Sequence, residues 1–203
     1  MKNKLYVLLE AILLAAIMYT MKFTDGRQTY LLMYSCIVIN TLMIVTAANN
    51  LVKLGLVITL IADTFLVLLN DYWLWGVGCF CLVQTCYALH VGIDRRQLIV
   101  RGLVLVIAEV LLGPLCGWDL LVVLSIYSFT QLFFNTVYAF VRKVNARFCW
   151  GLLLFLFCDL NVGLMNIGSY VSGFPAAIDN LASYLCWAFY VPGQVLIVLS
   201  LIK

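Results

Sequence analysis

Residues 51–69 read LVKLGLVITLIADTFLVLL, an apolar run broken only by a lysine near its start and by Asp63 past its middle. A helix needs about 20 such residues to cross the hydrocarbon core of a bilayer, which is about 30 Å thick. The stretch therefore predicts a membrane-spanning helix. Asp63 within it is costly unless it is paired, hydrated or protonated, so it marks a candidate functional site.

The composition of the whole chain leads to the same prediction. The 203 residues are 66% hydrophobic and 10% charged, whereas soluble domains are about 45–50% apolar and about 25% charged. A soluble fold of this composition would expose contiguous apolar surface and aggregate. The net charge of +3 comes from clusters in short loops and does not indicate a nucleic-acid partner. We expect an all-α polytopic membrane protein whose main partner is the lipid bilayer.

Polar breaks divide the chain into about eight transmembrane helices within a single integral membrane domain, residues 1–203. The apolar run after the N-terminal lysines is interpreted as a retained first span, because no small-residue cleavage pattern followed by a soluble domain appears. The expected spans are 4–23, 29–48, 51–69, 72–91, 98–116, 118–140, 148–170 and 180–201.

The lysines and arginines predict the orientation of these spans. With eight spans, ten of the 12 basic residues fall on one side and only Lys22 and Arg27 on the other. Short cytoplasmic loops are enriched in Lys and Arg, so both termini are expected in the cytoplasm. Short loops and the absence of organelle signals favour a bacterial inner membrane. The cations expected at the cytoplasmic rim, where they could attract a lipid phosphate, are Arg95, Arg96, Arg101, Arg142, Lys143 and Arg147.

The eight cysteines invite a metal-site interpretation, chiefly through Cys79, Cys81 and Cys86. These lie within an apolar run, and His90 is the only histidine of the chain. Zinc sites usually combine C-x-x-C knuckles with histidine partners. Free cysteine otherwise behaves as a small buried hydrophobe. We therefore expect structural cysteines, no metal and no cofactor.

Four acidic residues fall inside expected spans: Glu10, Asp63, Glu109 and Asp159. Asp63 follows Lys53 by ten residues and Asp159 follows Arg147 by twelve, which places both carboxylates roughly 15–18 Å from the cytoplasmic edge. Glu10 is closer to the edge, where it could snorkel or accept a hydrogen bond, and Glu109 could pair with Arg101 on its own helix face. The two aspartates are therefore the sharper candidates. Their alternative role is as hydrogen-bonded contacts between helices.

The surroundings of the two aspartates are similar. The pattern Gly55-Leu56-x3-Leu60-x2-Asp63 recurs 96 residues later as Gly151-Leu152-x3-Leu156-x2-Asp159. The recurrence indicates a possible tandem four-helix repeat. Helical spacing places Asp63 on one face with Gly55, Thr59 and Asn70, and Asp159 on one face with Gly151, Gly163 and Asn166. Polar residues of other spans, which predict a cavity inside the bundle, include Gln84, Tyr87, Gln131 and Asn135.

Two segments resemble the YhhN-like family of membrane proteins, which includes the lysoplasmalogenases. The family pattern reads roughly G-D-x-F-L-x-L, then G-x3-F and A-H-x2-Y, and a second motif reads G-x3-F-x2-S-D. The matching segments are Ala62-Asp63-Thr64-Phe65-Leu66-Val67-Leu68, Gly76 with Phe80, Gln84-Thr85-Cys86-Tyr87, and Gly151 to Phe155 with Cys158-Asp159. Gln84 stands where the family has a histidine, Ala62 where it has a glycine and Cys158 where it has a serine.

The resemblance implies an intramembrane hydrolase that cleaves the vinyl ether bond of a lysoplasmalogen, a lysophospholipid, to a fatty aldehyde and a glycerophospho-alcohol. It implies Asp63 and Asp159 as the catalytic pair, one donating a proton and the other acting as carboxylate. Gln84, Tyr87, Gln131 and Asn135 would bind substrate or support the pair. Gln84 cannot relay a proton as histidine does. A proton-coupled small-molecule or lipid transporter and a non-catalytic lipid-binding membrane protein therefore stay open as alternatives.

Overall fold

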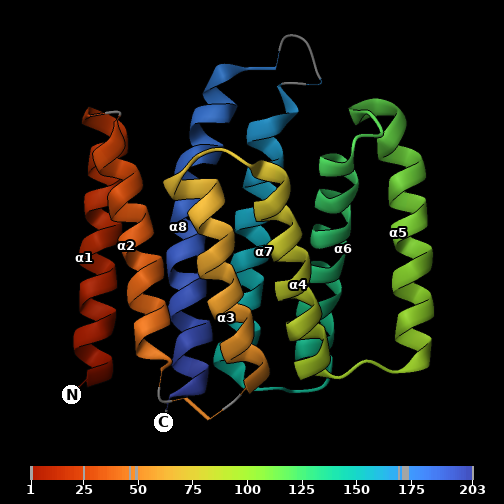
Figure 1. Cartoon of the computed structure of the whole chain (residues 1–203), viewed down its shortest axis with the longest axis horizontal. Helices are drawn as coiled ribbons and strands as arrows, with labels where there is room; N and C mark the ends of the chain where they lie inside the picture. The colour runs from red at the N-terminus through yellow and green to blue at the C-terminus, as the bar shows by residue number, and fades with distance from the viewer. Residues whose placement is uncertain are drawn as a thin grey trace. The chain divides into compact units, whose positions relative to one another are not determined.

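A computed structural model describes residues 2–24, 26–45, 47–48, 50–168, 170 and 174–202. This part of the chain is 87% helical and contains eight helices and no strand (Figure 1). A π-helical segment, η1, continues α3. The elements are α1 (Lys2–Phe23), α2 (Arg27–Met43), α3 (Asn50–Asp63), η1 (Thr64–Leu68), α4 (Trp73–Val91), α5 (Arg95–Cys116), α6 (Leu120–Val141), α7 (Ala146–Ile167) and α8 (Ala176–Leu201).

Seven helices of the described chain are long and apolar enough to cross a membrane, when α3 and η1 are taken together as Leu51–Leu68. The prediction of an all-helical, multi-pass membrane protein is confirmed at this level. The remaining helix, α2, has 17 residues and ends at Met43 rather than at the predicted residue 48. The sidedness of the membrane and the cytoplasmic termini stay predictions.

The helices form two compact units. Unit 1 comprises residues 1–45 and 147–203, and therefore contains α1, α2, α8 and all but the first residue of α7. Unit 2 comprises residues 46–146 and contains α3 to α6 with η1. The predicted tandem repeat would join the first four helices and the last four. The units do not follow that order, so the repeat stays a prediction.

In unit 1, α1 packs against α2 and α8 (Figure 1). The crossing of α7 with α8 depends on Gly151 and Gly193. A Cβ atom built on Gly151 would lie 2.9 Å from the carbonyl oxygen of Gly193 and 2.7 Å from Cγ1 of Ile197. One turn further on, the rings of Phe155 and Tyr190 meet edge to face at a centroid distance of 5.6 Å. Small residues allow such close backbone approach, which is how membrane helices associate without a hydrophobic driving force.

In unit 2, α3 packs on α4, α4 on α6, and α6 on α5 (Figure 1). The turn between α4 and α5 is held from both sides. Gly92 adopts a left-handed conformation with φ of 87°, and Asp94 caps α5 by accepting the backbone N–H of Gln97 at 2.8 Å. From the end of α6, Arg142 donates to the carbonyl oxygen of Val91 and to the Asp94 carboxylate, each at 3.2 Å. One charged side chain therefore links the ends of three helices.

The glycine contact predicts unequal effects of two alanine substitutions on the same helix. Gly151→Ala should destabilise the protein by about 1–3 kcal/mol, because the added methyl group meets backbone atoms of α8 that cannot move aside locally. Gly163 has no atom within 4 Å of a built Cβ, so Gly163→Ala should be neutral or stabilising by about 0.5–1 kcal/mol. Thermal unfolding in detergent, followed by circular dichroism, measures both. Equal stabilities of the two variants would contradict the close crossing of α7 and α8.

Asp94 predicts a pH dependence of stability. The Gln97 backbone hydrogen bond, followed by the charge of Arg142, holds the pKa of the Asp94 carboxyl below its ordinary value of 3.8. A lowered carboxyl pKa in the folded state stabilises fully above the unfolded-state pKa, and this stabilisation is lost as the pH falls through the folded-state pKa.

Asp94→Asn keeps a side chain that caps helices well but removes the charge. Its Tm should lie below that of the wild type at pH 7, and the difference should shrink as the pH is lowered below about 4. A Tm difference that is the same at pH 7 and pH 3 would exclude a contribution from the ionised carboxylate.

Candidate functional site

Asp63 lies at the junction between α3 and the π-helical segment η1. Its side chain is buried, with 3% of its surface exposed, and the wider spacing that follows shows in the bond from the Leu69 N–H to the carbonyl oxygen of Thr64 at 2.9 Å. Short π-helical segments are rare and occur frequently at functional sites. The segment also ends the helix early: Asn70, with φ of 48°, lies in the following loop. The prediction that Asn70 shares the face of Asp63 is therefore wrong.

Tyr87 of α4 brings a hydroxyl group to this aspartate. Its ring crosses α3 at Gly55, where a built Cβ would lie 2.6 Å from Cε1 of the ring. Its phenol lies next to the side chain of Thr59 and near Asp63. Tyr87 and Thr59 are both buried. Glycine at position 55 therefore allows the Tyr87 ring to lie across α3. The Tyr87 hydroxyl then lies at the level of Thr59, one helix turn before Asp63.

A chain of amide side chains continues from α4 to α6. Gln84 precedes Tyr87 by about one turn and is fully buried. The Nδ2 atom of Asn135 donates to the backbone oxygen of Gln84 at 2.9 Å and to its Oε1 at 3.1 Å. The Nε2 atom of Gln84 has no hydrogen-bond partner among the described residues. It is therefore a buried donor that is available to a water molecule or a substrate oxygen.

The network ends on Arg101 of α5. Its Nη1 atom donates to Oδ1 of Asn135 at 2.9 Å and to Oε1 of Gln131 at 2.8 Å. The guanidinium also lies over the rings of Phe134 and Tyr138, 5.5 and 5.7 Å from their centroids. Aromatic faces attract such cations. Unit 2 thus brings together five predicted site residues, which are Asp63, Gln84, Tyr87, Gln131 and Asn135.

Sequence reasoning missed the place of Arg101 in this network. We predicted it at the rim or paired with Glu109, but its side chain is 2% exposed and bonds to α6 instead. The oxygens of Glu109 have no hydrogen-bond partner in the described part of the chain, so the predicted pair is wrong. The available signal was the spacing of Gln131 and Asn135, which places two amides on one face of α6.

Asp159, the second predicted catalytic residue, lies on α7 in unit 1 and is partly exposed. Next to it, the Cys158 thiol approaches Cys186 of α8, with 3.4 Å between the sulfur atoms. Gly163 and Asn166 are exposed, and the Asn166 side chain bonds back to its own helix. The predicted inward-facing stripe is therefore wrong at those two positions. Asp63 belongs to unit 2, and the structure describes the two aspartates separately.

Unit 1 contains a second buried polar cluster, between α1 and α2. Glu10 is only 1% exposed, which excludes the predicted snorkelling. Its carboxylate meets the Cys36 thiol and accepts no nitrogen or oxygen donor among the described residues. Nearby on the same two helices, the Tyr6 hydroxyl donates to Oδ1 of Asn40. Glu10 is thus a more deeply buried carboxylate than its sequence position indicated.

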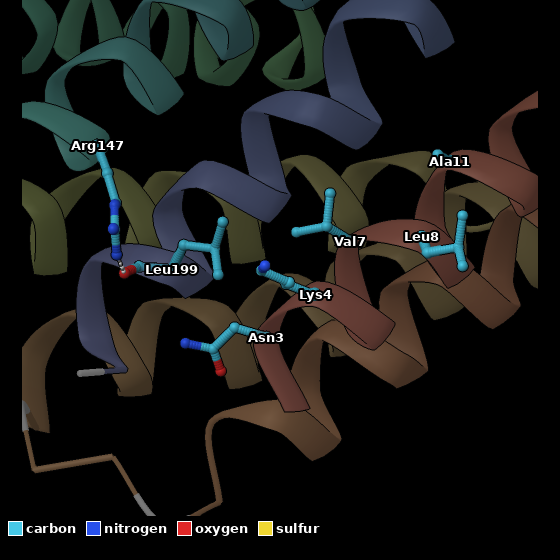
Figure 2. A pocket seen from close by; sticks show the side chains of 7 residues that line it. All are labelled: Asn3, Lys4, Val7, Leu8, Ala11, Arg147 and Leu199. Atoms are coloured by element: carbon cyan, nitrogen blue, oxygen red, sulfur yellow. Dashed lines mark hydrogen bonds between the residues drawn. The ribbon is translucent and has the colours of Figure 1, made fainter. Parts of the chain in front are cut away.

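An open groove lies at the end of unit 1 where α1 begins and α8 ends (Figure 2). Figure 2 shows Arg147 reaching from α7 to the carbonyl oxygen of Leu199, to which its Nη1 donates at 2.9 Å. Lys4 of α1 lines the same groove. The groove combines these two cations with apolar walls, as a site for the head of an amphiphile would. Its lining residues are Asn3, Lys4, Val7, Leu8, Ala11, Arg147 and Leu199.

Within the described residues, no group of three or more His, Cys, Asp or Glu side chains is placed to hold a metal ion. None of the eight cysteines, all of which lie in the described part of the chain, forms a disulfide. Six are buried, namely Cys36, Cys81, Cys86, Cys149, Cys158 and Cys186, and Cys79 and Cys116 are partly exposed.

No family model, curated protein or solved structure matches the chain. The likeness to the YhhN-like family therefore stays a proposal from the motifs around Asp63 and Asp159.

The amide network predicts a strong effect of Asn135→Leu. The substitution removes an acceptor from a buried guanidinium and a donor from Gln84, and a hydrogen bond to a charged group contributes about 1.5–3 kcal/mol. The control is Ser125→Leu on the same helix, because Ser125 is exposed and bonds only to the carbonyl oxygen of Leu121 at 2.8 Å. Its effect should stay within about 0.5 kcal/mol. Unfolding free energies in detergent that fall equally in both variants would contradict the network.

Proposed function

We propose that the protein is an intramembrane lipid hydrolase that resembles a lysoplasmalogenase. It would cleave the vinyl ether bond of a lysoplasmalogen to a fatty aldehyde and a glycerophospho-alcohol. The observation that carries the proposal is the buried Asp63 at the π-helical junction, with the Tyr87 hydroxyl beside it and the unpartnered Nε2 of Gln84 one turn away. Hydrolysis of a vinyl ether needs a proton donor and a water molecule, so a buried carboxyl group beside a hydroxyl and an amide donor supports the proposal.

The chemistry needs one acid and one carboxylate. A proton adds to the β-carbon of the vinyl ether, which leaves an oxocarbenium ion on the carbon bonded to oxygen. Water attacks that carbon and loses a proton to the carboxylate. The hemiacetal then breaks its bond to the glycerol oxygen, which takes up a proton, so one water is consumed and no electrons are exchanged. We assign the acid and carboxylate roles to Asp63 and Asp159 without choosing between them.

Gln84 and Tyr87 would act by hydrogen bonding rather than by proton transfer. The free Nε2–H of Gln84 can hold the attacking water or the ether oxygen, and the Asn135 amide fixes its orientation through Oε1. The Tyr87 hydroxyl can donate a hydrogen bond to the negative charge that develops on the glycerol oxygen as the hemiacetal breaks. Preorganised donors of this kind stabilise a transition state because they do not need to reorient. Gln131 and Asn135 are the supporting residues of this proposal.

Purified protein supplied with a lysoplasmalogen should release a fatty aldehyde, measured by coupling to an NADH-dependent alcohol dehydrogenase. Asp63→Asn and Asp159→Asn should each lower the rate by about 100-fold or more, because an acid or base in the transition state contributes about 10²–10⁴-fold. Glu109→Gln is the matched control, since it also neutralises a carboxyl group within a span. It should keep its rate within about twofold of the wild type. Wild-type protein that releases no product from a panel of ether and ester lysolipids would refute the hydrolase.

The proton-coupled transporter is the second candidate, and Glu10 is the observation that favours it. Carboxylates inside membrane proteins often carry protons in pumps and transporters, and Glu10 is buried without a nitrogen or oxygen donor in the described chain. Substrate-dependent proton uptake into liposomes that is lost in Glu10→Gln, with no aldehyde release, would replace the hydrolase by this candidate.

A further inference from the structure

Arg101 has hydrogen-bond donors that have no partner in the network around it. Its guanidinium stays protonated in proteins and has five N–H donors. Nη1 bonds to Gln131 and Asn135, whereas Nε and Nη2 have no hydrogen-bond partner among the described residues. Buried donors without partners are uncommon, because each has lost its hydrogen bonds to water.

The guanidinium also has no counter-ion in the part of the chain that the structure describes. Among the described residues, Arg101 forms no salt bridge with a carboxylate, and no aspartate or glutamate contributes to its electrostatic surroundings. Arg142 is a second cation, and Asp94 already pairs with it at 3.2 Å. A buried charge normally requires an opposite charge, so the surroundings of Arg101 favour an added anion.

The unused atoms form one edge of the guanidinium. The N–H of Nε and one N–H of Nη2 point in the same direction, and this edge matches two oxygens of a phosphate group. The rings of Phe134 and Tyr138 cover a face of the group, and Nη1 is fixed by two amides. These contacts hold the guanidinium plane in place, while the side-on edge is buried and has no hydrogen-bond partner among the described residues.

The position of Arg101 along α5 suits a lipid phosphate. It follows Arg95, the first residue of α5, by six residues, which corresponds to about 9 Å along the helix axis. The polar headgroup region of each leaflet is about 5–8 Å thick, so with Arg95 at its outer edge Arg101 would lie just inside the hydrocarbon boundary. A phosphate at the base of a headgroup needs to move only a short distance to meet it.

We infer that Arg101, held by Gln131 and Asn135, is a binding site for a phosphate group, and that the ligand is the phosphodiester of a lysophospholipid. The inference deepens the proposed function, on which it rests for the identity of the lipid. The phosphate chemistry rests on Arg101 alone, and a free phosphate would share it. Arg101 would then hold the headgroup while the ether bond extends into the membrane.

Binding without turnover tests the site. Delipidated protein in neutral detergent is titrated with lyso-phosphatidylethanolamine carrying a stable alkyl ether, with monoacylglycerol, and with inorganic phosphate, and Tm is measured. The alkyl ether lipid should raise the Tm of the wild type, and monoacylglycerol, which lacks phosphate, should not. Stabilisation by inorganic phosphate alone, without any by the lipid, would overturn the lipid assignment. No stabilisation by either phosphate compound would overturn the site.

Three variants locate the effect. Arg101→Gln should weaken lipid binding by at least tenfold, and Arg101→Lys should weaken it too, because an ammonium group lacks the two-pronged edge. Lys22→Gln removes an exposed cation on α1, which has no part in the proposed site, and should bind as the wild type does. Equal binding by the wild type and Arg101→Gln would overturn the proposal. If Arg101→Gln does not fold, the lipid-against-monoacylglycerol comparison on the wild type and on Arg101→Lys still decides.

The binding and turnover experiments can fail independently. The alkyl ether lipid has no vinyl ether bond, so its binding does not require hydrolysis. Phosphate-dependent binding without aldehyde release would retain the site and refute the hydrolase. Aldehyde release with the same KM in the wild type and Arg101→Gln would retain the hydrolase and refute the site.

Discussion

The arrangement of unit 2 depends on how a buried guanidinium is held. Arg101 is nearly inaccessible to solvent, and the Arg side chain does not lose its charge in a protein. Two amide oxygens of α6 accept hydrogen bonds from the guanidinium, and two aromatic rings lie against it, which stabilises part of the charge. Because the Oδ1 atom of Asn135 accepts from Arg101, its Nδ2 atom points to α4, where it donates to the backbone oxygen and Oε1 of Gln84. One charge on α5 thus orients side chains on two further helices, α6 and α4.

The same orientation connects to the aspartate. Gln84 and Tyr87 are one turn apart on α4. The hydrogen bonds that hold Gln84 therefore also limit the rotation of this helix about its axis, and with it the direction of the Tyr87 side chain. Tyr87 can lie across α3 only because residue 55 is glycine, and its hydroxyl then reaches Thr59 and Asp63. A polar line therefore runs from α5 through α6 and α4 to α3, and it ends at the π-helical junction. In the proposed reaction the phosphate would lie at one end and the ether bond at the other.

Unit 1 is held together by a different kind of interaction. Its α7–α8 crossing depends on backbone contact at Gly151 and Gly193 and on aromatic packing of Phe155 against Tyr190. Its polar groups are sparser: Asp159 is partly exposed, and Glu10 has a cysteine thiol as its polar neighbour. The matching local motifs of the two aspartates therefore do not correspond to matching surroundings.

Local sequence was sufficient for the features that depend on composition along one helix. Apolar runs of membrane-spanning length and the placement of Gln84, Tyr87, Gln131 and Asn135 on helices follow from neighbouring residues alone. The sequence also singled out Asp63, because an aspartate in such a run is rare. It did not show the π-helical segment after Asp63, which changes the helix spacing and moves Asn70 off the predicted face.

Only the tertiary structure decided the partners. Arg101 could equally have faced Glu109 on its own helix, and the choice of Gln131 and Asn135 depends on which helix lies beside α5 and on its rotation. The grouping of α1 and α2 with α7 and α8 has the same origin. Hydropathy is a property of each segment, whereas side-chain pairing depends on the distance and rotation between segments, and those are set by contacts between residues far apart in the chain.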